Sequence, residues 1–144
     1  MKTNEFRQHL HDDKIVAAIR EAELQTSGEI RVFISHKKIV DPVKAAQAAF
    51  VLLEMTNTRE RNSVLILVAP QTRRFAVIGD QGVHDRCGDE FWRLLADEMS
   101  GYFKSSQFTE GIVHAVHKAG ELLAGHFPRR DDDKNELSDE VARD

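Results

Sequence analysis

Three short segments of the chain have the hydrophobic pattern of β-strands. Residues 29–36 alternate between apolar and polar side chains, which is typical of a strand with one face in a core. Residues 63–69, reading SVLILVA, are apolar almost throughout and indicate a strand buried on both faces of its sheet. Polar turn residues at 70–73 separate this segment from a third predicted strand at 74–80.

Four other segments place apolar residues at the three- and four-residue spacing of amphipathic helices. They cover residues 12–27, 41–55, 89–102 and 109–125. We expect Asp12 or Asp13 to cap the first helix and Gly28 to end it. In the second helix, the Asp41 carboxylate can cap free amides, and Pro42 occupies a position where no N–H is needed.

The order of these elements predicts the topology of the sheet. A strand, a helix and a strand between residues 29 and 69 form a parallel crossover, whereas the short link before residue 74 allows only an antiparallel hairpin. The central strand then presents two groups of buried side chains to opposite faces, which are Val64, Ile66 and Val68, and Leu65 and Leu67. Because both faces need cover, the predicted fold class is α/β, a three-layer α/β/α sandwich with a small mixed sheet.

The length and charge of the chain indicate one domain followed by a tail. At 144 residues the chain suffices for one ordinary core, which we assign to residues 1–128. Residues 129–144 contain seven acids, four bases and few large apolar groups, so we expect a disordered acidic tail. The tail contributes −3 of the net charge of −4, and the nearly neutral remainder does not favour nucleic acid as a partner.

Several features lead us to expect a cytoplasmic protein without direct membrane insertion. No apolar run approaches the ~20 residues that a membrane span requires. The first residues include His9, His11 and Asp12, where a secretory signal would need an apolar stretch. The single cysteine, Cys87, excludes an intrachain disulfide and is consistent with a reducing compartment.

The predicted topology brings loops together at the two ends of the sheet. The two parallel strands at 29–36 and 63–69 start at the same end, and the antiparallel strand at 74–80 finishes there. We call one end the first rim, formed by residues 27–29, 59–62 and 79–89. The other end, the second rim, is formed by residues 36–38 and 73–74.

The first rim contains the candidate functional residues. Its segment GDQGVHDRCGDE concentrates acids, a histidine and a cysteine among glycines, a composition that can hold a divalent ion or position an acid and a base. The predicted catalytic residues are Asp80 and Asp85, the predicted ligand-binding residues are Glu29, Arg59, Arg61, Asn62 and His84, and the predicted metal ligands are Asp80, Asp85 and Asp89. In the alternative, the segment only leads into a helix, and Arg61 and Asp80 pair to tie loops together.

Three further groups of side chains favour structural interpretations. His84 and Cys87 have the spacing of metal ligands, but a zinc site needs three or four ligands and the chain has no other cysteine. His114 and His117 share a helical face that we expect to be solvated. The basic second rim could receive a phosphate beyond the carboxyl ends of parallel strands, yet it lacks a glycine-rich cradle, so an ordinary basic edge is favoured.

Taken together, the motifs resemble the TPM domain family over about residues 10–128. The resemblance is carried by SGEIRVFIS, by RNSVLILVAPQTRRFAVIGDQG and by QFTEGIVHAV, and most specifically by Asn62, the corner at 79–82 and the helix start at 108–112. It implies an α/β/α sandwich, frequent attachment to membranes through extra segments, calcium binding in some members and phosphatase activity in some. In the family, the loop before the long apolar strand is commonly acidic and contains glycine. In this chain the same loop reads TNTRERN and contains two arginines.

Two functions follow as hypotheses. The first is a ligand- or partner-binding module of undefined physiological role, which takes an unknown protein or a small phosphorylated ligand at the first rim, because no complete catalytic signature is present. The alternative is a weak phosphate monoester hydrolase that uses a divalent cation, calcium or magnesium. In that case Asp80 or Asp85 acts as nucleophile, base or metal ligand, and the arginines steady the anion.

Overall fold

A computed structural model describes residues 11–88, 90–105, 107–129 and 136–144. The elements in chain order are α2 (Asp12–Glu23), β1 (Glu29–Ile34), α3 (Pro42–Leu52), β2 (Ser63–Ala69), the 3-10 turn η1 (Pro70–Thr72), β3 (Arg74–Gly79), α4 (Gln81–Cys87), α5 (Glu90–Lys104), α6 (Phe108–His126) and β4 (Ala142–Arg143).

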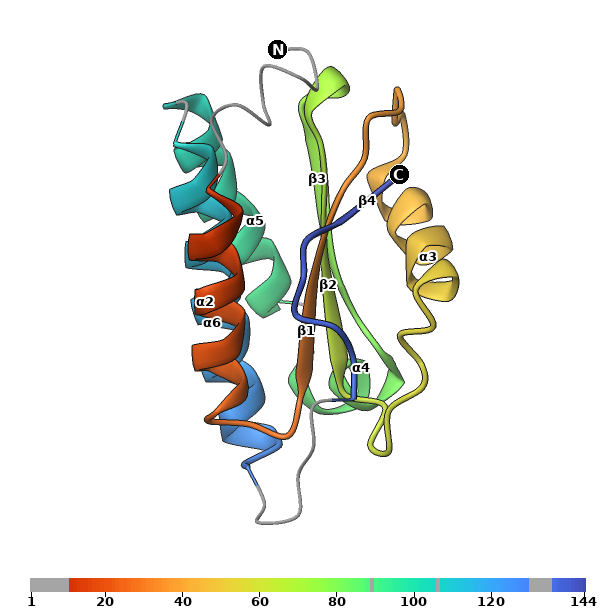
Figure 1. Cartoon of the computed structure of the whole chain (residues 1–144), viewed down its shortest axis with the longest axis vertical. Coiled ribbons are helices and arrows are strands. Elements are labelled where there is room, and N and C mark those ends of the chain that lie inside the picture. The colour runs from red at the N-terminus through yellow and green to blue at the C-terminus, as the bar shows by residue number, and fades with distance from the viewer. Residues whose placement is uncertain (1–10, 89, 106, 130–135) are drawn as a thin grey trace.

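The sheet is mixed and has the strand order β3-β2-β1-β4. Strand β1 pairs in parallel with β2 and with β4, and β2 pairs antiparallel with β3. Helices α2, α5 and α6 cover one face of the sheet, and α3 covers the other (Figure 1). The predicted three-layer α/β/α sandwich is confirmed.

Every residue of β2 is buried, as its apolar sequence predicts. Val64, Ile66 and Val68 belong to the core beneath α2, α5 and α6, because alternate side chains of a strand point to opposite faces. Leu65 and Leu67 belong to the core beneath α3. The strand therefore fixes both cores and separates the two rims at its ends.

The helix boundaries agree with the sequence pattern at most positions. The Asp41 carboxylate accepts a hydrogen bond from the Lys44 amide at 3.1 Å and caps α3 as predicted. At α2, however, the N-cap residue is His11, and the two expected caps, Asp12 and Asp13, lie in the first turn. Acidic side chains are also favourable there, because they face the positive end of the helix dipole.

Helix α2 ends at Glu23, four residues before its predicted end. The following residues leave the helix because they bond to the end of α6. The Thr26 hydroxyl donates to the Phe127 carbonyl, and the Ser27 amide donates to the same oxygen at 2.9 Å. A contact with a residue 100 positions away thus decides this boundary.

Helix α4 lies within the segment expected to be a glycine-rich loop. Its N-cap is Asp80, whose Oδ1 accepts from the Gln81 amide at 2.7 Å. Val83 is fully buried in the core on the α2, α5 and α6 side, which fixes this short helix to the domain. A seven-residue helix is too short to show a clear periodicity in the sequence.

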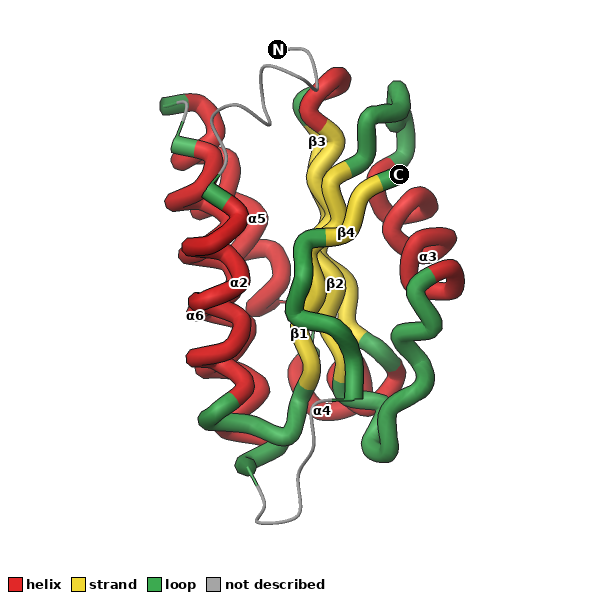
Figure 2. The backbone as a smooth tube through the Cα atoms, in the orientation of Figure 1, coloured by secondary structure: helices red, strands yellow, loops and turns green. Residues whose placement is uncertain are grey.

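The expectation of a disordered tail is wrong for residues 136–144. This segment runs along β1 and ends in β4, where Ala142 lies opposite Phe33 and Arg143 opposite Ile34 (Figures 1 and 2). Residues 130–135 lie outside the described residues. The tail composition is polar, but specific partners on β1 hold its last nine residues.

Candidate functional site

The first rim is fastened by an ion pair between Arg61 and Asp80. Arg61 Nε lies 2.7 Å from Asp80 Oδ2, and Arg61 Nη2 lies 2.9 Å from Oδ1. The Asp80 side chain is only 5% exposed, whereas that of Arg61 is 46% exposed. The hydrogen bonds and charge of Asp80 raise the pKa of Arg61. Both carboxylate oxygens of Asp80, a predicted catalytic and metal-binding residue, therefore accept hydrogen bonds from Arg61, and Oδ1 also accepts one from the Gln81 amide.

The backbone around this pair is equally constrained. Arg61 adopts a left-handed conformation with φ of 52°, and its carbonyl accepts from the Gly82 amide at 2.9 Å. A Cβ at Gly82 would lie 2.5 Å from the Glu60 carbonyl oxygen, so only glycine allows this approach. The loop before β2 and the start of α4 therefore form one rigid corner.

A second network joins the loop at 59–62 to the start of β1. Glu60 Oε2 accepts from Ser27 Oγ at 2.8 Å and from Asn62 Nδ2 at 3.2 Å. Asn62 is 1% exposed, and its Oδ1 has no hydrogen-bond partner among the described residues. The exposed Arg59 uses its backbone amide to donate to Glu136 Oε2 at 3.0 Å.

Glu29 belongs to a buried carboxyl pair with Glu23. Glu29 is 2% exposed and Glu23 is 8% exposed, and burial raises the pKa of both. Glu29 Oε1 accepts from the Glu136 amide, and Glu23 Oε2 accepts from the Ile30 amide at 3.1 Å. Glu29 Oε2 has no hydrogen-bond partner among the described residues. Besides burial, the neighbouring side chains of Asp139 and Glu29 also raise the pKa of Glu23. The predicted ligand residue Glu29 is thus a covered internal group.

Helix α4 carries two other predicted first-rim residues. His84 and Asp85 are exposed on α4, and Asp89 lies outside the described residues. Within the described ranges, no three His, Cys, Asp or Glu side chains are placed to hold a metal ion. Cys87 is half-buried, and burial raises the pKa of its thiol, which disfavours the thiolate that binds metals. The calcium or magnesium site stays a prediction.

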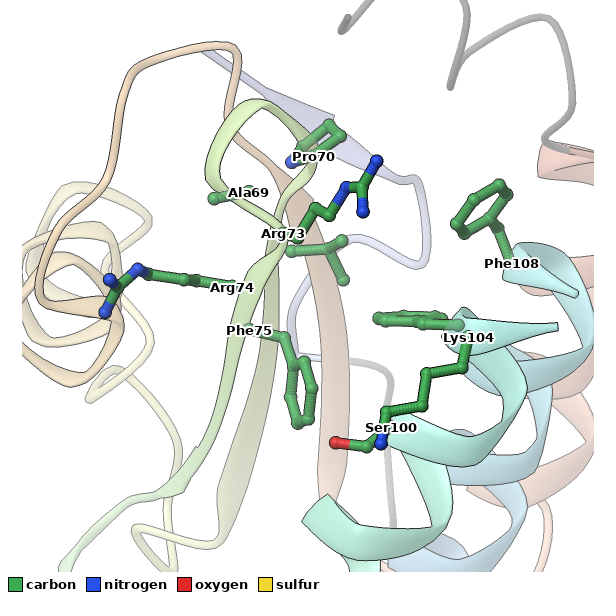
Figure 3. Close-up of a pocket in the computed structure, with 10 residues that line it drawn as sticks. Ala69, Pro70, Arg73, Arg74, Phe75, Ser100, Lys104 and Phe108 are labelled. Atoms are coloured by element: carbon green, nitrogen blue, oxygen red, sulfur yellow. The ribbon is translucent and has the colours of Figure 1, made fainter. Parts of the chain in front are cut away.

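The second rim contains a cavity of about 460 Å³ between the β2–β3 turn and the helices α5 and α6 (Figure 3). Its lining residues are Val68, Ala69, Pro70, Arg73, Arg74, Phe75, Ser100, Phe103, Lys104 and Phe108. No Asp or Glu occurs among the described residues that line it. We call this cavity the second-rim pocket.

The aromatic residues of the second-rim pocket form a contact chain. The ring centroids of Phe75 and Phe103 are 5.6 Å apart in an edge-to-face arrangement, and those of Phe103 and Phe108 are 5.8 Å apart. Arg73, in a left-handed conformation, extends from the turn toward the helices, while Arg74 extends to the opposite side (Figure 3). Arg74 Nη1 donates to the Val40 carbonyl at 2.8 Å.

The structure thus divides the basic residues predicted for the second rim. Arg73 faces the second-rim pocket together with Lys104 of α5, which the sequence did not single out (Figure 3). Neither forms an ion pair with a residue in the part of the chain that the structure describes. His36 instead contacts Asp144, with Nδ1 2.5 Å from Oδ1. No sequence spacing links Arg73 to Lys104, because they lie on separate elements.

Comparison with known proteins identifies the family. The family model of the TPM domain matches residues 8–122. The chain belongs to the TPM domain family. The BA42 protein from the psychrophilic bacterium Bizionia argentinensis is 38% identical, with a TM-score of 0.85 over 94% of this chain and 95% of that one.

A more distant structure shares the fold of this TPM domain. The N-terminal domain of a protein from P. gingivalis is 18% identical and has a TM-score of 0.54, covering 79% of this chain and 75% of that one. No curated protein matches the chain. Among the described residues, no helix has both the length and the apolar character needed to span a membrane.

Proposed function

We propose that this TPM domain is a binding module whose ligand is a small amphipathic anion held in the second-rim pocket. The observation that carries the proposal is an apolar, phenylalanine-lined cavity flanked by Arg73 and Lys104, with no acidic side chain among its described lining residues. A carboxylate or phosphate is the chemical group that such cations complement, and an aromatic or aliphatic body suits the rings.

The size and position of the pocket support the same proposal. Ligand sites are commonly cavities of roughly 300–1,000 Å³ with a mainly apolar lining and a few polar groups. The pocket lies beyond Val68 and Ala69, at the carboxyl end of β2, where ligands commonly bind in sheets with parallel strands. The first rim offers less, because Asp80, Glu29 and Asn62 are buried and committed to internal contacts.

Titration calorimetry with decanoate and with decanol tests the proposal. We expect decanoate to bind, and the double variant Arg73→Gln/Lys104→Gln to bind it roughly tenfold more weakly, since hydrogen bonds to charged groups contribute about 1.5–3 kcal/mol before solvent screening. Decanol should bind both proteins equally. Arg93→Gln, an exposed position also on α5, is the matched control. Absence of binding to wild-type protein, or equal losses for decanol and decanoate, would refute the proposal.

Phosphate monoester hydrolysis is the second candidate. The matching family model is named for phosphatases, which favours the activity, and the predicted residues for it remain Asp80 and Asp85. We would assay p-nitrophenyl phosphate with and without magnesium or calcium. The hydrolase hypothesis expects Asp80→Asn/Asp85→Asn to abolish turnover in a folded protein. Turnover that survives this double substitution removes the first rim from the chemistry.

A further inference from the structure

We infer that the β1 edge is a docking site for an extended acidic segment of a partner protein, and that residues 136–144 of this chain occupy the site in cis. The β1 edge is the side of β1 facing away from β2, together with Ser35 and His36. The 136–144 segment passes along it (Figure 2). This interaction surface is separate from the second-rim pocket and does not depend on a ligand there.

Both ends of the segment are clamped by hydrogen bonds. At one end, Asp144 Oδ2 accepts from Ser35 Oγ at 2.6 Å, and Oδ1 accepts from the His36 amide at 2.8 Å. At the other end, the Glu136 amide donates to Glu29 Oε1, and Glu136 Oε2 accepts from the Arg59 amide. Two acidic side chains therefore mark the ends of the bound stretch.

Between the clamps, two arginines supply the positive charge that faces the segment, while Asp139 also lies close enough to Glu23 and Glu29 to raise the pKa of both. Arg20 Nε lies 3.5 Å from Asp139 Oδ2, and Arg31 Nη2 donates to the Glu140 carbonyl at 3.4 Å. The 136–144 segment has four acids and one base. Several of the groups that bind it contact backbone or carboxylate atoms, so they select an extended acidic chain more than a unique sequence.

The cis segment leaves much of the strand edge unused. Only Ala142 and Arg143 pair with β1, opposite its last two residues, so the positions at 29–32 have no strand partner on this side among the described residues. Leu137, Val141 and Ala142 are only half-buried. A partner segment that pairs along more of β1 would gain main-chain hydrogen bonds, as in strand addition to sheet edges. The cis segment competes because its linkage gives it a high effective concentration.

A labelled peptide with the sequence of residues 136–144 tests the inference by fluorescence anisotropy. The receptor is the full chain with Ala142→Pro/Asp144→Asn, which removes an N–H and an anionic clamp from the cis segment without touching the β1 edge. We expect this release variant to bind the peptide at least tenfold more tightly than wild-type protein does. Asp97→Asn, an exposed position on α5, serves as the matched control.

Two changes locate the binding. A peptide with its final Asp replaced by Asn, and the release variant carrying Ser35→Ala, should each show about tenfold weaker binding, since both remove a charge-assisted hydrogen bond. The peptide change needs no protein variant to fold. Amide exchange of residues 30–34 in the release variant should accelerate and then slow again when peptide is added.

Three results would overturn the inference. One is that the peptide binds wild-type protein and the release variant equally tightly, although faster amide exchange in β1 shows that residues 136–144 have left the edge in the variant. Another is a scrambled peptide that binds as tightly, which would indicate charge attraction alone. The third is a dimer in sedimentation that the peptide dissolves, which would assign the edge to a second copy. If β1 amide exchange stays slow in the variant, the test is the chemical shifts of wild-type protein in an excess of peptide. Shift changes confined to β1 would support docking, and the absence of any shift change would refute it.

Discussion

The two rims of this domain use charge in opposite ways. At the first rim the charged side chains make internal contacts: Arg61 pairs with Asp80, and Glu29 contacts the neighbouring Glu23 side chain and the Glu136 amide. At the second-rim pocket, two cations lie beside phenylalanines and an open volume of about 460 Å³. The first rim, which is rich in polar residues, is therefore held together by internal contacts, whereas the second-rim pocket has few polar residues and is open.

The difference shows that residue type alone does not distinguish a functional loop from a structural one. Acids, a histidine and glycines in one short stretch are typical of catalytic loops. Here Asp80 is needed as a helix cap and as the partner of Arg61, while Gly82 is needed for a close backbone contact. A better indicator is a charged group without a described ion-pair partner next to concave apolar surface.

Removing the Asp80 carboxylate should have the largest effect on stability. We expect Asp80→Ala to cost roughly 2–4 kcal/mol, because it deletes an N-cap worth about 1 kcal/mol and hydrogen bonds to a charged group worth about 1.5–3 kcal/mol. Urea unfolding measures the loss. Asp85→Ala, at an exposed position on the same short helix, is the control and should cost under about 0.5 kcal/mol. Equal costs would mean that the pair does not fasten the first rim.

The buried carboxyl pair should make stability fall with rising pH. Burial raises the pKa of Glu23 above its ordinary 4.5, so the unfolded chain loses this proton first as the pH rises past that value. Between pH 4.5 and the raised pKa of Glu23, the free energy of unfolding should therefore fall by at most about 1.4 kcal/mol per pH unit for this one proton.

In the variant Glu23→Gln, the side chain at position 23 no longer titrates, and its amide N–H can still donate a hydrogen bond to Glu29. Its stability advantage over wild-type protein should therefore grow between pH 5 and pH 9 in urea unfolding. Glu21→Gln, an exposed position on α2, should run parallel to wild-type protein. Parallel curves for Glu23→Gln as well would show that the carboxyl pair holds no proton.

Deleting residues 136–144 should uncover the first rim and the β1 edge. We expect a loss of about 1–2 kcal/mol, or several degrees in melting temperature for a domain of this size. The half-buried Leu137, Val141 and Ala142 and the hydrogen bonds of Glu136 are the reason. Deleting only 140–144 keeps the Glu136 clamp and should cost less. An unchanged melting temperature would restore the picture of a disordered tail.

Replacing Arg73 should have the smallest effect on the fold. Arg73→Gln removes an exposed cation without a described ion-pair partner, so we expect a change below about 0.5 kcal/mol. The same substitution at Arg61 breaks a bidentate pair and should destabilise the fold more than the change at Arg73. Thermal unfolding of both variants compares the rims directly. A costly Arg73→Gln would mean that this side chain supports the fold instead of facing a ligand.

The hydrophobic pattern alone determined the sandwich. The run at 63–69 specified a strand buried on both faces, and its alternation assigned Ile66 to one core and Leu65 to the other. The short link before β3 required a hairpin. These features follow from periods of two and 3.6 residues and from chain reach, which are local properties of a sequence.

Only the tertiary structure decided the end of α2, the helix at 81–87, the docking of 136–144 and the second-rim pocket. Each depends on partners far apart in the chain, such as the Phe127 carbonyl for Ser27 or Ser35 for Asp144. A polar tail has too little apolar surface to predict order from composition, yet clamps on a preformed strand edge hold it. The pocket likewise exists because a turn and two helices meet, and no sequence spacing encodes that meeting.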